Sequence, residues 1–305
     1  MIKHSDSIPV LSIVTPSYNQ GEFIEDAIRS VLSQKGAFYI DYIIMDGLST
    51  DTSLSVIERY ERVLRTSSQR LEKQGLEFYV AKGQDSELNR CKGISYRWIS
   101  RKDGGQVHAI NAGLRLAVGS VCAYINSDDL YYPGAFDYVA RCQWADTDFL
   151  YGKGMWISET GGNILPYPTL KPSKESFYYE CTLCQPAVFI NKGVVDDIGL
   201  FSTAYDFIFD YEYWMRALFK RKKFVFAKRL LAKSRMHFGN KSLSNTEKAD
   251  REKTALLGRY YGIKKPNALA RVLARFFVKY YTGVQTERMR KFLRGTRQGV
   301  IEGHS

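Results

Sequence analysis

The stretch Cys122-Ala-Tyr-Ile-Asn126-Ser127-Asp128-Asp129 is a short apolar run that ends in an amide and two carboxylates. Such a run is typical of a buried strand, and the strand would bring Asn126, Asp128 and Asp129 to one edge of a sheet. Oxygen-rich side chains on a rigid strand end suit a hard divalent cation that also carries substrate phosphates. The same residue types also occur in turns and at helix caps, so the pattern of the neighbouring sequence has to decide between these interpretations.

Strands and helices alternate on the N-terminal side of this stretch. Apolar, β-rich runs predict strands at residues 10–15, 39–45 and 76–80, and residues 120–125 form the strand that leads to the acidic end. Helical spacing of apolar residues follows the first two strands, and residues 106–118 predict a further helix, preceded by a loop rich in polar residues. This alternation predicts an α/β fold with right-handed crossovers and a mostly parallel central sheet flanked by helices.

Polar clusters follow three of the predicted strands. They cover residues 16–19, 46–51 and 126–129. The carboxyl ends of parallel strands meet at one edge of a sheet, and ligands of open α/β sheets bind in the crevice at that edge. The sequence therefore predicts a binding cleft for a polar, nucleotide-like ligand.

The second half of the chain is less regular. Residues 148–152 and 154–158 predict two strands or a hairpin, residues 185–190 a strand, and residues 194–198 a short helix. Residues 206–220 predict a helix whose first turn carries Asp210 and Glu212, and residues 223–232 predict a strand that ends in a basic loop with His237.

Composition bounds the class of protein. The 305 residues are 45% hydrophobic and 25% charged, which is ordinary for a soluble globular protein. The polar N-terminus does not resemble a signal peptide, and no apolar segment reaches the length of a membrane span, so we expect an intracellular protein that does not cross a bilayer. The five cysteines and four histidines lack the spacing of a zinc site or a disulfide framework, and we expect reduced cysteines.

Five motifs in this order resemble the family 2 glycosyltransferases of the GT-A fold. They are Ser12-Ile-Val-Thr-Pro-Ser-Tyr-Asn19, Ile44-Met-Asp-Gly-Leu-Ser-Thr-Asp51, Lys102-Asp-Gly-Gly-Gln-Val-His-Ala-Ile-Asn-Ala-Gly113, Ile125-Asn-Ser-Asp-Asp129 and Asp210-Tyr-Glu-Tyr-Trp-Met-Arg216. The branch that the chain resembles most builds bacterial surface polysaccharides. The resemblance covers about residues 8–240 and implies a Rossmann-like, mostly parallel sheet with a nucleotide-sugar half (about 8–130) and an acceptor half (about 131–240).

The resemblance also implies which residues bind the donor. Asp128 is implied as a direct ligand of Mn²⁺ or Mg²⁺, although the first position of the usual Asp-x-Asp is Asn126 in this chain. The other implied contacts, to the base, the ribose, the sugar or metal-bound water, are Pro16, Tyr18, Asn19, Asp46, Asp103, Gln106, Asn126 and Asp129. Tyr18 has a flat face for stacking on a pyrimidine, while a plain turn followed by a capped helix is the structural alternative for Tyr18 and Asp46.

An inverting transfer needs a base that takes the proton from the acceptor hydroxyl, and the resemblance assigns this role to Asp210. Its alternative is an ordinary acidic residue at a helix N-terminus. Glu212 is the competing candidate, but residues two apart do not share a helix face, so both cannot point at one hydroxyl. Trp214 is expected in the core or beneath the acceptor, and Arg216 could pair with Glu212 four residues before it.

Two histidines lie near the predicted cleft, and different roles are expected for them. His237 falls where relatives present His or Arg to the diphosphate or the metal, and we include it as a metal ligand, with packing as the alternative. His108 lies on the predicted helix near Gln106 and is expected to be structural.

The C-terminal extension, residues 241–305, is predicted to be basic and helical. Residues 216–305 hold 24 Lys and Arg against 5 Asp and Glu, whereas residues 1–215 hold 20 against 27. Apolar residues at helical spacing share one stripe of residues 267–280, with Arg271, Arg275 and Lys279 on another, which predicts an amphipathic basic helix. The apolar stripe could lie on an anionic membrane beside a lipid-linked acceptor, or pack on the catalytic domain or on a second copy in a homodimer.

Three functions therefore compete. The first is an inverting, metal-dependent hexosyl transfer from a nucleoside diphosphate sugar, UDP-linked, to a glycan or lipid-linked acceptor in bacterial polysaccharide synthesis, in the cytoplasm or on the inner face of the membrane. The second is a nucleotidyltransferase, but Pro16-Ser-Tyr-Asn-Gln20 lacks the Gly-rich, basic phosphate loop that this class needs. The third is a non-catalytic nucleic-acid binder driven by the basic tail, which leaves the three polar clusters unexplained, so we expect no nucleic acid.

Overall fold

The computed structural model describes residues 8–83, 87–237 and 246–262, and in the tail residues 268–269, 272–280, 283–284, 287–288 and 291. The strands are β1 (Val10–Ser17), β2 (Tyr39–Asp46), β3 (Ser68–Lys73), β4 (Leu76–Ala81), β5 (Gly93–Ser100), β6 (Val121–Tyr124), β7 (Leu130–Tyr131), β8 (Phe149–Ile157), β9 (Asn163–Pro166), β10 (Val188–Asn191) and β11 (Phe224–Arg235). The α-helices are α1 (Ile24–Leu32), α2 (Ser53–Ser67), α3 (Gln106–Leu116), α4 (Ala135–Ala140), α5 (Lys174–Phe177), α6 (Lys192–Ile198), α7 (Phe209–Phe219) and α9 (Thr246–Tyr261).

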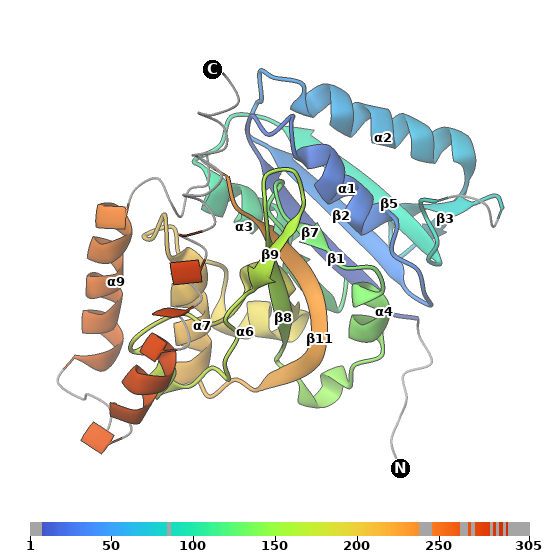
Figure 1. Ribbon diagram of the computed structural model, residues 1–305. Coiled ribbons are helices and arrows are strands. Elements are labelled where there is room, and N and C mark those ends of the chain that lie inside the picture. The colour runs from blue at the N-terminus through green and yellow to red at the C-terminus, as the bar shows by residue number, and fades with distance from the viewer. Residues whose placement is uncertain are drawn as a thin grey trace, which may run out of the picture.

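The strands form one mixed sheet in the order β3-β4-β5-β2-β1-β6-β10-β8-β11-β7, with β9 paired to β8 (Figure 1). The neighbours β5, β2, β1 and β6 are parallel to one another, as the alternation of strands and helices predicts. The second half of the chain adds β10, which is antiparallel to both β6 and β8, and β11, which is parallel to β8. The predicted mixed, mostly parallel sheet flanked by helices is confirmed.

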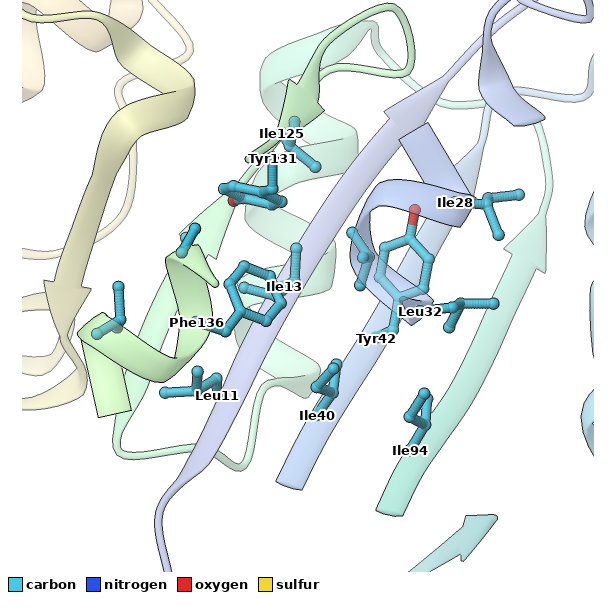
Figure 2. Packing of buried hydrophobic residues seen from close by; sticks show 14 of the residues in the cluster. Leu11, Ile13, Ile28, Leu32, Ile40, Tyr42, Ile94, Ile125, Tyr131 and Phe136 are labelled. Carbon is cyan, nitrogen blue, oxygen red and sulfur yellow. The ribbon is translucent and has the colours of Figure 1, made fainter. Parts of the chain in front are cut away.

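Helices cover both faces of the parallel part of the sheet, so its strands are buried on both sides. On one face, Leu11 and Ile13 pack in a cluster with residues of α1, α2 and α4, and Figure 2 shows Ile28, Leu32 and Phe136 around these strands. On the other face, Val14 and its neighbours pack in a second cluster with α3 and α7. Side chains of successive strand residues point to opposite faces, which is why one strand serves both clusters.

The polar segment before α3 contains β5, so the prediction of a plain loop there is wrong. β5 pairs in parallel with β2 along its whole length and lies in the interior of the sheet. Ile94 and Tyr96 are buried. Arg97, the next residue, forms an ion pair at 2.6 Å with the buried Asp41. The alternation of apolar and polar residues was the signal for a strand, and the ion pair explains how its arginine is accommodated.

The two strands expected at residues 148–152 and 154–158 are the single strand β8. Gly152 and Gly154 do not turn the chain. They leave space for neighbours instead: a Cβ atom at Gly152 would lie 2.5 Å from the Leu231 side chain, and one at Gly154 would lie 2.2 Å from Cys184 Sγ. The turn near Gly161-Gly162 then leads into β9, which pairs antiparallel with β8.

The strand expected at residues 185–190 begins with a 3₁₀ turn, Gln185–Ala187, before β10. The five cysteines are free, as expected. Among the described helices, none combines the length and the apolar character that crossing a bilayer requires.

Candidate active site

A cavity of about 820 Å³ lies where the carboxyl ends of β1 and β6 meet the first turn of α7. Nine of the residues singled out from the sequence line it: Pro16, Tyr18, Asp103, Gln106, Asn126, Asp128, Asp129, Asp210 and His237. Tyr18 and Asp210 are almost two hundred positions apart in the chain. The loops after separate strands therefore meet at one cavity, and the helix that carries Asp210 closes it from the other side.

The acidic end of β6 is held by residues at the end of β11 and just after it. Asp128 Oδ2 lies 3.0 Å from Nε2 of His237, and both side chains are mostly buried. The N–H of Arg235 donates to Asp129 Oδ1 at 2.9 Å. Asn126 Oδ1 accepts a hydrogen bond from Gln106 Nε2 at 2.8 Å, which ties the first turn of α3 to the same group.

Arg235 is a buried cation beside this acidic group, and the sequence interpretation gave it no role. Its Nε donates to the carbonyl oxygen of Asp128 at 2.8 Å, and its Nη2 forms an ion pair at 2.8 Å with Asp26 of α1. Its guanidinium also lies over the ring of Phe23, 5.1 Å from the ring centroid. These contacts fix the backbone that presents Asp128. A basic residue shortly after the predicted strand of residues 223–232 was the available signal.

The two neighbouring aspartates differ in their surroundings. Asp129 is 3% exposed, and burial raises its pKa well above the ordinary value, with a further rise from the charge of Asp128. Asp128 is more open, with 17% of its side chain exposed at the cavity wall. Asp128 is therefore the more accessible of the two carboxyls, and the predicted contact of Asp129 with the donor stays a prediction.

At the end of the cavity formed by the loop after β1, Tyr18 is 63% exposed and leaves a face free for a flat ligand. Asp103 accepts a hydrogen bond from the N–H of Gly105 at 2.7 Å, and Gly105 has φ +105°, which turns the chain into α3. Pro16 lies at the end of β1. These residues come from two separate segments, the end of β1 with its following loop and the loop before α3, and they face one space.

Two of the residues implied by the resemblance are set back from this cavity. Asp46 is buried at the end of β2, where Ser49 donates to it from its N–H at 2.9 Å and Ser100 donates from its hydroxyl at 2.6 Å. Asn19 lines an adjacent recess, and its Oδ1 accepts the N–H of Thr50 at 2.8 Å. In the structure both side chains hold the loop after β2, and their contact with a nucleotide stays a prediction.

Asp210 lies in the first turn of α7 and is half-buried in the cavity wall. The N–H of Tyr211 donates to its Oδ1 at 2.7 Å. Burial of the carboxyl raises the pKa of Asp210 to about 6, because removal from water disfavours the charged form. A carboxyl with this pKa is ionised at neutral pH and is a better proton acceptor than an ordinary aspartate.

The competing candidates on α7 have structural roles. Glu212 is 1% exposed and forms an ion pair at 2.7 Å with Arg216, as the spacing of four residues predicts. Tyr260 of α9 also donates to Glu212 at 2.9 Å. Trp214 is buried in the core, and His108 is exposed on α3. Glu212 is therefore engaged away from the cavity, which leaves Asp210 as the acid of α7 that lines it.

A further residue that the sequence did not reveal is Glu252 of α9. Its carboxylate accepts the backbone N–H groups of Asp206, Phe207 and Ile208 at 3.0, 2.9 and 3.3 Å. These N–H groups precede the start of α7, where a negative charge is favoured by the helix dipole. Glu252 lies more than forty residues after this segment, so no local pattern could have indicated the contact. The described part of the C-terminal extension thus holds the segment that presents Asp210.

The remaining wall of the cavity is aromatic and polar. Trp156 and Tyr167 lie with ring centroids 4.9 Å apart, on β8 and after β9. Gln185 donates from Nε2 to the carbonyl oxygen of Tyr124 at 2.9 Å. Its buried Oε1 and the hydroxyl of Ser17 have no hydrogen-bond partner in the described part of the chain, and both residues line the cavity. Buried polar atoms of this kind can bind a polar ligand.

The side chains at the cavity include possible ligands for a divalent cation. The described residues contain no cluster of three or more His, Cys, Asp or Glu side chains placed to hold a metal ion on their own. Asp128 and His237 nevertheless place a carboxylate oxygen and an imidazole nitrogen together at the cavity. Mn²⁺ and Mg²⁺ at nucleotide sites use one or two protein side chains and take further ligands from phosphate and water. The donor set fits a cation that is completed by a diphosphate.

Sequence comparisons agree with the geometry. The family model described as "Glycosyl transferase family 2" matches residues 12–75. An uncharacterized glycosyltransferase of Rickettsia conorii is 24% identical over 254 residues, which is 77% of this chain and 36% of that protein. TuaG of Bacillus subtilis, a glycosyltransferase named for teichuronic acid biosynthesis, is 29% identical over 38% of this chain and 45% of that protein. The chain thus spans about a third of the length of the Rickettsia relative.

Solved structures share the fold. Staphylococcus aureus TarS, residues 1–349 in complex with UDP-GlcNAc, superposes with a TM-score of 0.57 at 16% identity and covers 89% of this chain and 71% of that one. The mannosyltransferase PcManGT of Pyrobaculum calidifontis, in complex with GDP-Man and Mn²⁺, gives a TM-score of 0.54 at 12% identity, over 94% and 75% of the two chains. The predicted resemblance to family 2 glycosyltransferases is confirmed, and the fold is GT-A.

Proposed function

We propose that this chain transfers a hexosyl group, with inversion, from a nucleoside diphosphate sugar to a hydroxyl of a glycan or lipid-linked acceptor in bacterial polysaccharide synthesis. The observation that carries the proposal is the cavity that Asp128, His237 and Asp210 line together. A hydrogen-bonded carboxylate and imidazole lie on one side of it, and a carboxyl with a raised pKa lies on the start of α7. This arrangement suits a reaction in which one side holds a diphosphate and the other accepts a proton.

The nucleotide side of the cavity suits a uridine donor. Tyr18 offers an exposed ring for stacking on the base, and Asp103 and Gln106 face the same space. The TarS structure that shares the fold holds UDP-GlcNAc, which supports a UDP-linked sugar as the first donor to test. The unpartnered Ser17 hydroxyl and Gln185 Oε1 are available to the ribose or the sugar hydroxyls.

Asp128 and His237 are the residues that would hold Mn²⁺ or Mg²⁺. A bound cation would supply positive charge to the diphosphate as it leaves. The PcManGT structure supports this assignment, since that mannosyltransferase holds Mn²⁺ together with its nucleotide sugar. Asn126 stands where an aspartate would add a negative charge, so the site is less acidic than an Asp-x-Asp pair and depends more on the diphosphate for ligands.

Asp210 is the proton acceptor in the transfer. The acceptor hydroxyl oxygen forms a bond to the anomeric carbon, the bond from that carbon to the diphosphate oxygen breaks, and the hydroxyl proton passes to the Asp210 carboxylate. Attack on the face opposite the leaving group inverts the configuration. Trp156 and Tyr167 form an aromatic wall on which an acceptor sugar can pack, and the relationship to TuaG supports a polysaccharide acceptor.

A donor screen tests the proposal. Thermal shift with UDP, GDP and their common sugars, each with and without Mn²⁺, should show stabilisation by one nucleotide class, because a ligand that binds the folded state raises its Tm. Slow metal-dependent release of nucleoside diphosphate from the same donor should follow. Phe226→Ser, an exposed substitution on β11 away from the cavity, serves as the matched control and should respond like the wild type. If no uridine or guanosine diphosphate ligand changes the Tm under either condition, the proposal fails.

A further inference from the structure

An apolar face on the helical residues 272–280 is exposed on the surface. Val272, Leu273, Phe276, Phe277 and Tyr280 are between 51% and 68% exposed. Successive helical residues are rotated by about 100°, so these five side chains fall within one continuous arc of the helix. The rings of Phe276 and Tyr280 stack, with centroids 6.2 Å apart. A contiguous patch of large apolar side chains marks an interaction site.

The opposite side of the same helix is the buried one. Val278 is 3% exposed, although it is smaller than the aromatic residues that face solvent. In this structure the five exposed residues therefore do not pack on the catalytic domain, which was one of the alternatives for the apolar stripe. The five larger apolar side chains of this helix thus point to solvent, while Val278 on the opposite side is buried.

Basic residues border the apolar face. Arg275 and Lys279 are exposed and lie on the helix beside it. Residues 262–305 contain ten Lys and Arg against two Asp and Glu, whereas residues 1–215 carry an excess of acidic residues. Positive charge is thus denser in this part of the sequence than in the first 215 residues. Aromatic and aliphatic residues on one side and Lys or Arg beside them are the features of helices that lie in a membrane interface.

We propose that the face formed by Val272, Leu273, Phe276, Phe277 and Tyr280 docks on the surface of an anionic lipid bilayer, with Arg275 and Lys279 at the headgroups. A second copy of the chain is a poorer occupant, because pairing two such faces would bring two strongly basic tails together. The proposed contact is a peripheral one, made by a helix that lies on the bilayer surface. This inference does not depend on sugar transfer, and its test measures lipid binding alone.

Vesicle flotation of the full chain tests the inference. Wild-type protein should float with vesicles of phosphatidylcholine and phosphatidylglycerol at least about tenfold more than with phosphatidylcholine alone, and the difference should shrink as salt is raised. Leu273→Ser/Phe276→Ser/Phe277→Ser should lower flotation by about tenfold or more, since it removes exposed apolar area that does not support the core. Arg275→Gln/Lys279→Gln should weaken the preference for anionic vesicles.

The matched control is Val63→Ser/Leu71→Ser, which removes exposed apolar side chains on α2 and β3 and should float like the wild type. Light scattering of wild-type and triple-variant protein completes the test. Absence of wild-type flotation with anionic vesicles overturns the inference, as does unchanged flotation of the triple variant. A dimer that the triple substitution converts to monomer, without lipid binding, would show that the face joins two copies.

Discussion

The two acidic regions of the cavity, the end of β6 and the start of α7, use the same residue type in different surroundings. Asp128 lies against His237 and a backbone fixed by the buried Arg235. Asp210 instead lies in a protein environment that raises its pKa to about 6. The chemistry of a carboxyl therefore depends on how far it is buried from water and on which groups lie beside it. One region is suited to hold an anion through a cation, and the other to accept a proton.

Asp210→Asn should give the largest effect. The amide has nearly the same shape but cannot accept a proton from the acceptor, so kcat for transfer should fall about a thousandfold. Binding of the nucleotide, measured by calorimetry with UDP and Mn²⁺, should stay within about twofold of the wild type. A variant that keeps most of its transfer rate would remove the proposed distinction between the two regions.

Asp128→Ala should change the binding of the nucleotide and of the metal, and not the proton transfer. Affinity for the nucleoside diphosphate in the presence of Mn²⁺ should fall by roughly a hundredfold, and the gain in affinity on adding Mn²⁺ should disappear. Titration of UDP with and without metal measures both quantities. Asp137→Asn on α4, which lies outside the cavity, is the control. Equal metal dependence in Asp128→Ala and the wild type would show that the cation is held elsewhere or is not used.

The raised pKa of Asp210 predicts that kcat/KM falls on the acidic side of the pH profile. The base must be ionised, so kcat/KM should fall about tenfold for each pH unit below about 6 and level off above it. This fall should be absent in Asp210→Asn. The folded state holds this proton more tightly than the unfolded state, so the contribution of Asp210 to stability is present at low pH and declines as the pH rises through about 6. Loss of activity at low pH therefore cannot come from unfolding caused by this group, and Tm measured across the same range checks this.

Glu252→Gln should give the smallest effect and tests how the α7 region is positioned. The substitution weakens the hydrogen bonds to the N–H groups of residues 206–208 and removes a negative charge from the start of the helix. We expect kcat to fall about tenfold while KM for the donor changes little, because these hydrogen bonds of Glu252 are to the segment that presents Asp210. Glu247→Gln, an exposed change in the same helix, is the matched control and should have no effect. A parallel rise in donor KM would indicate a general structural defect instead.

Much of the N-terminal half could be predicted from local pattern. The apolar runs at β1, β2 and β6 and the polar residues after them correctly indicate parallel neighbours whose loops meet, since both properties depend on residues close in sequence. β5 escaped prediction because Arg97 and two serines interrupt its apolar residues, and the partner that accommodates Arg97 is Asp41 on another strand. The continuity of β8 through Gly152 and Gly154 likewise depends on distant neighbours, Leu231 and Cys184.

The sequence by itself determined which residue types are available: the carboxylates after β6 and on α7, the flat ring of Tyr18 and the basic, amphipathic tail. Only the tertiary structure decided that Asp128 faces His237, that Glu252 holds the segment before Asp210, and that the apolar face of residues 272–280 points to solvent. The physical reason is that hydrogen bonding, burial and desolvation depend on which distant groups come together in space. Composition and periodicity describe only what each segment can offer to that assembly.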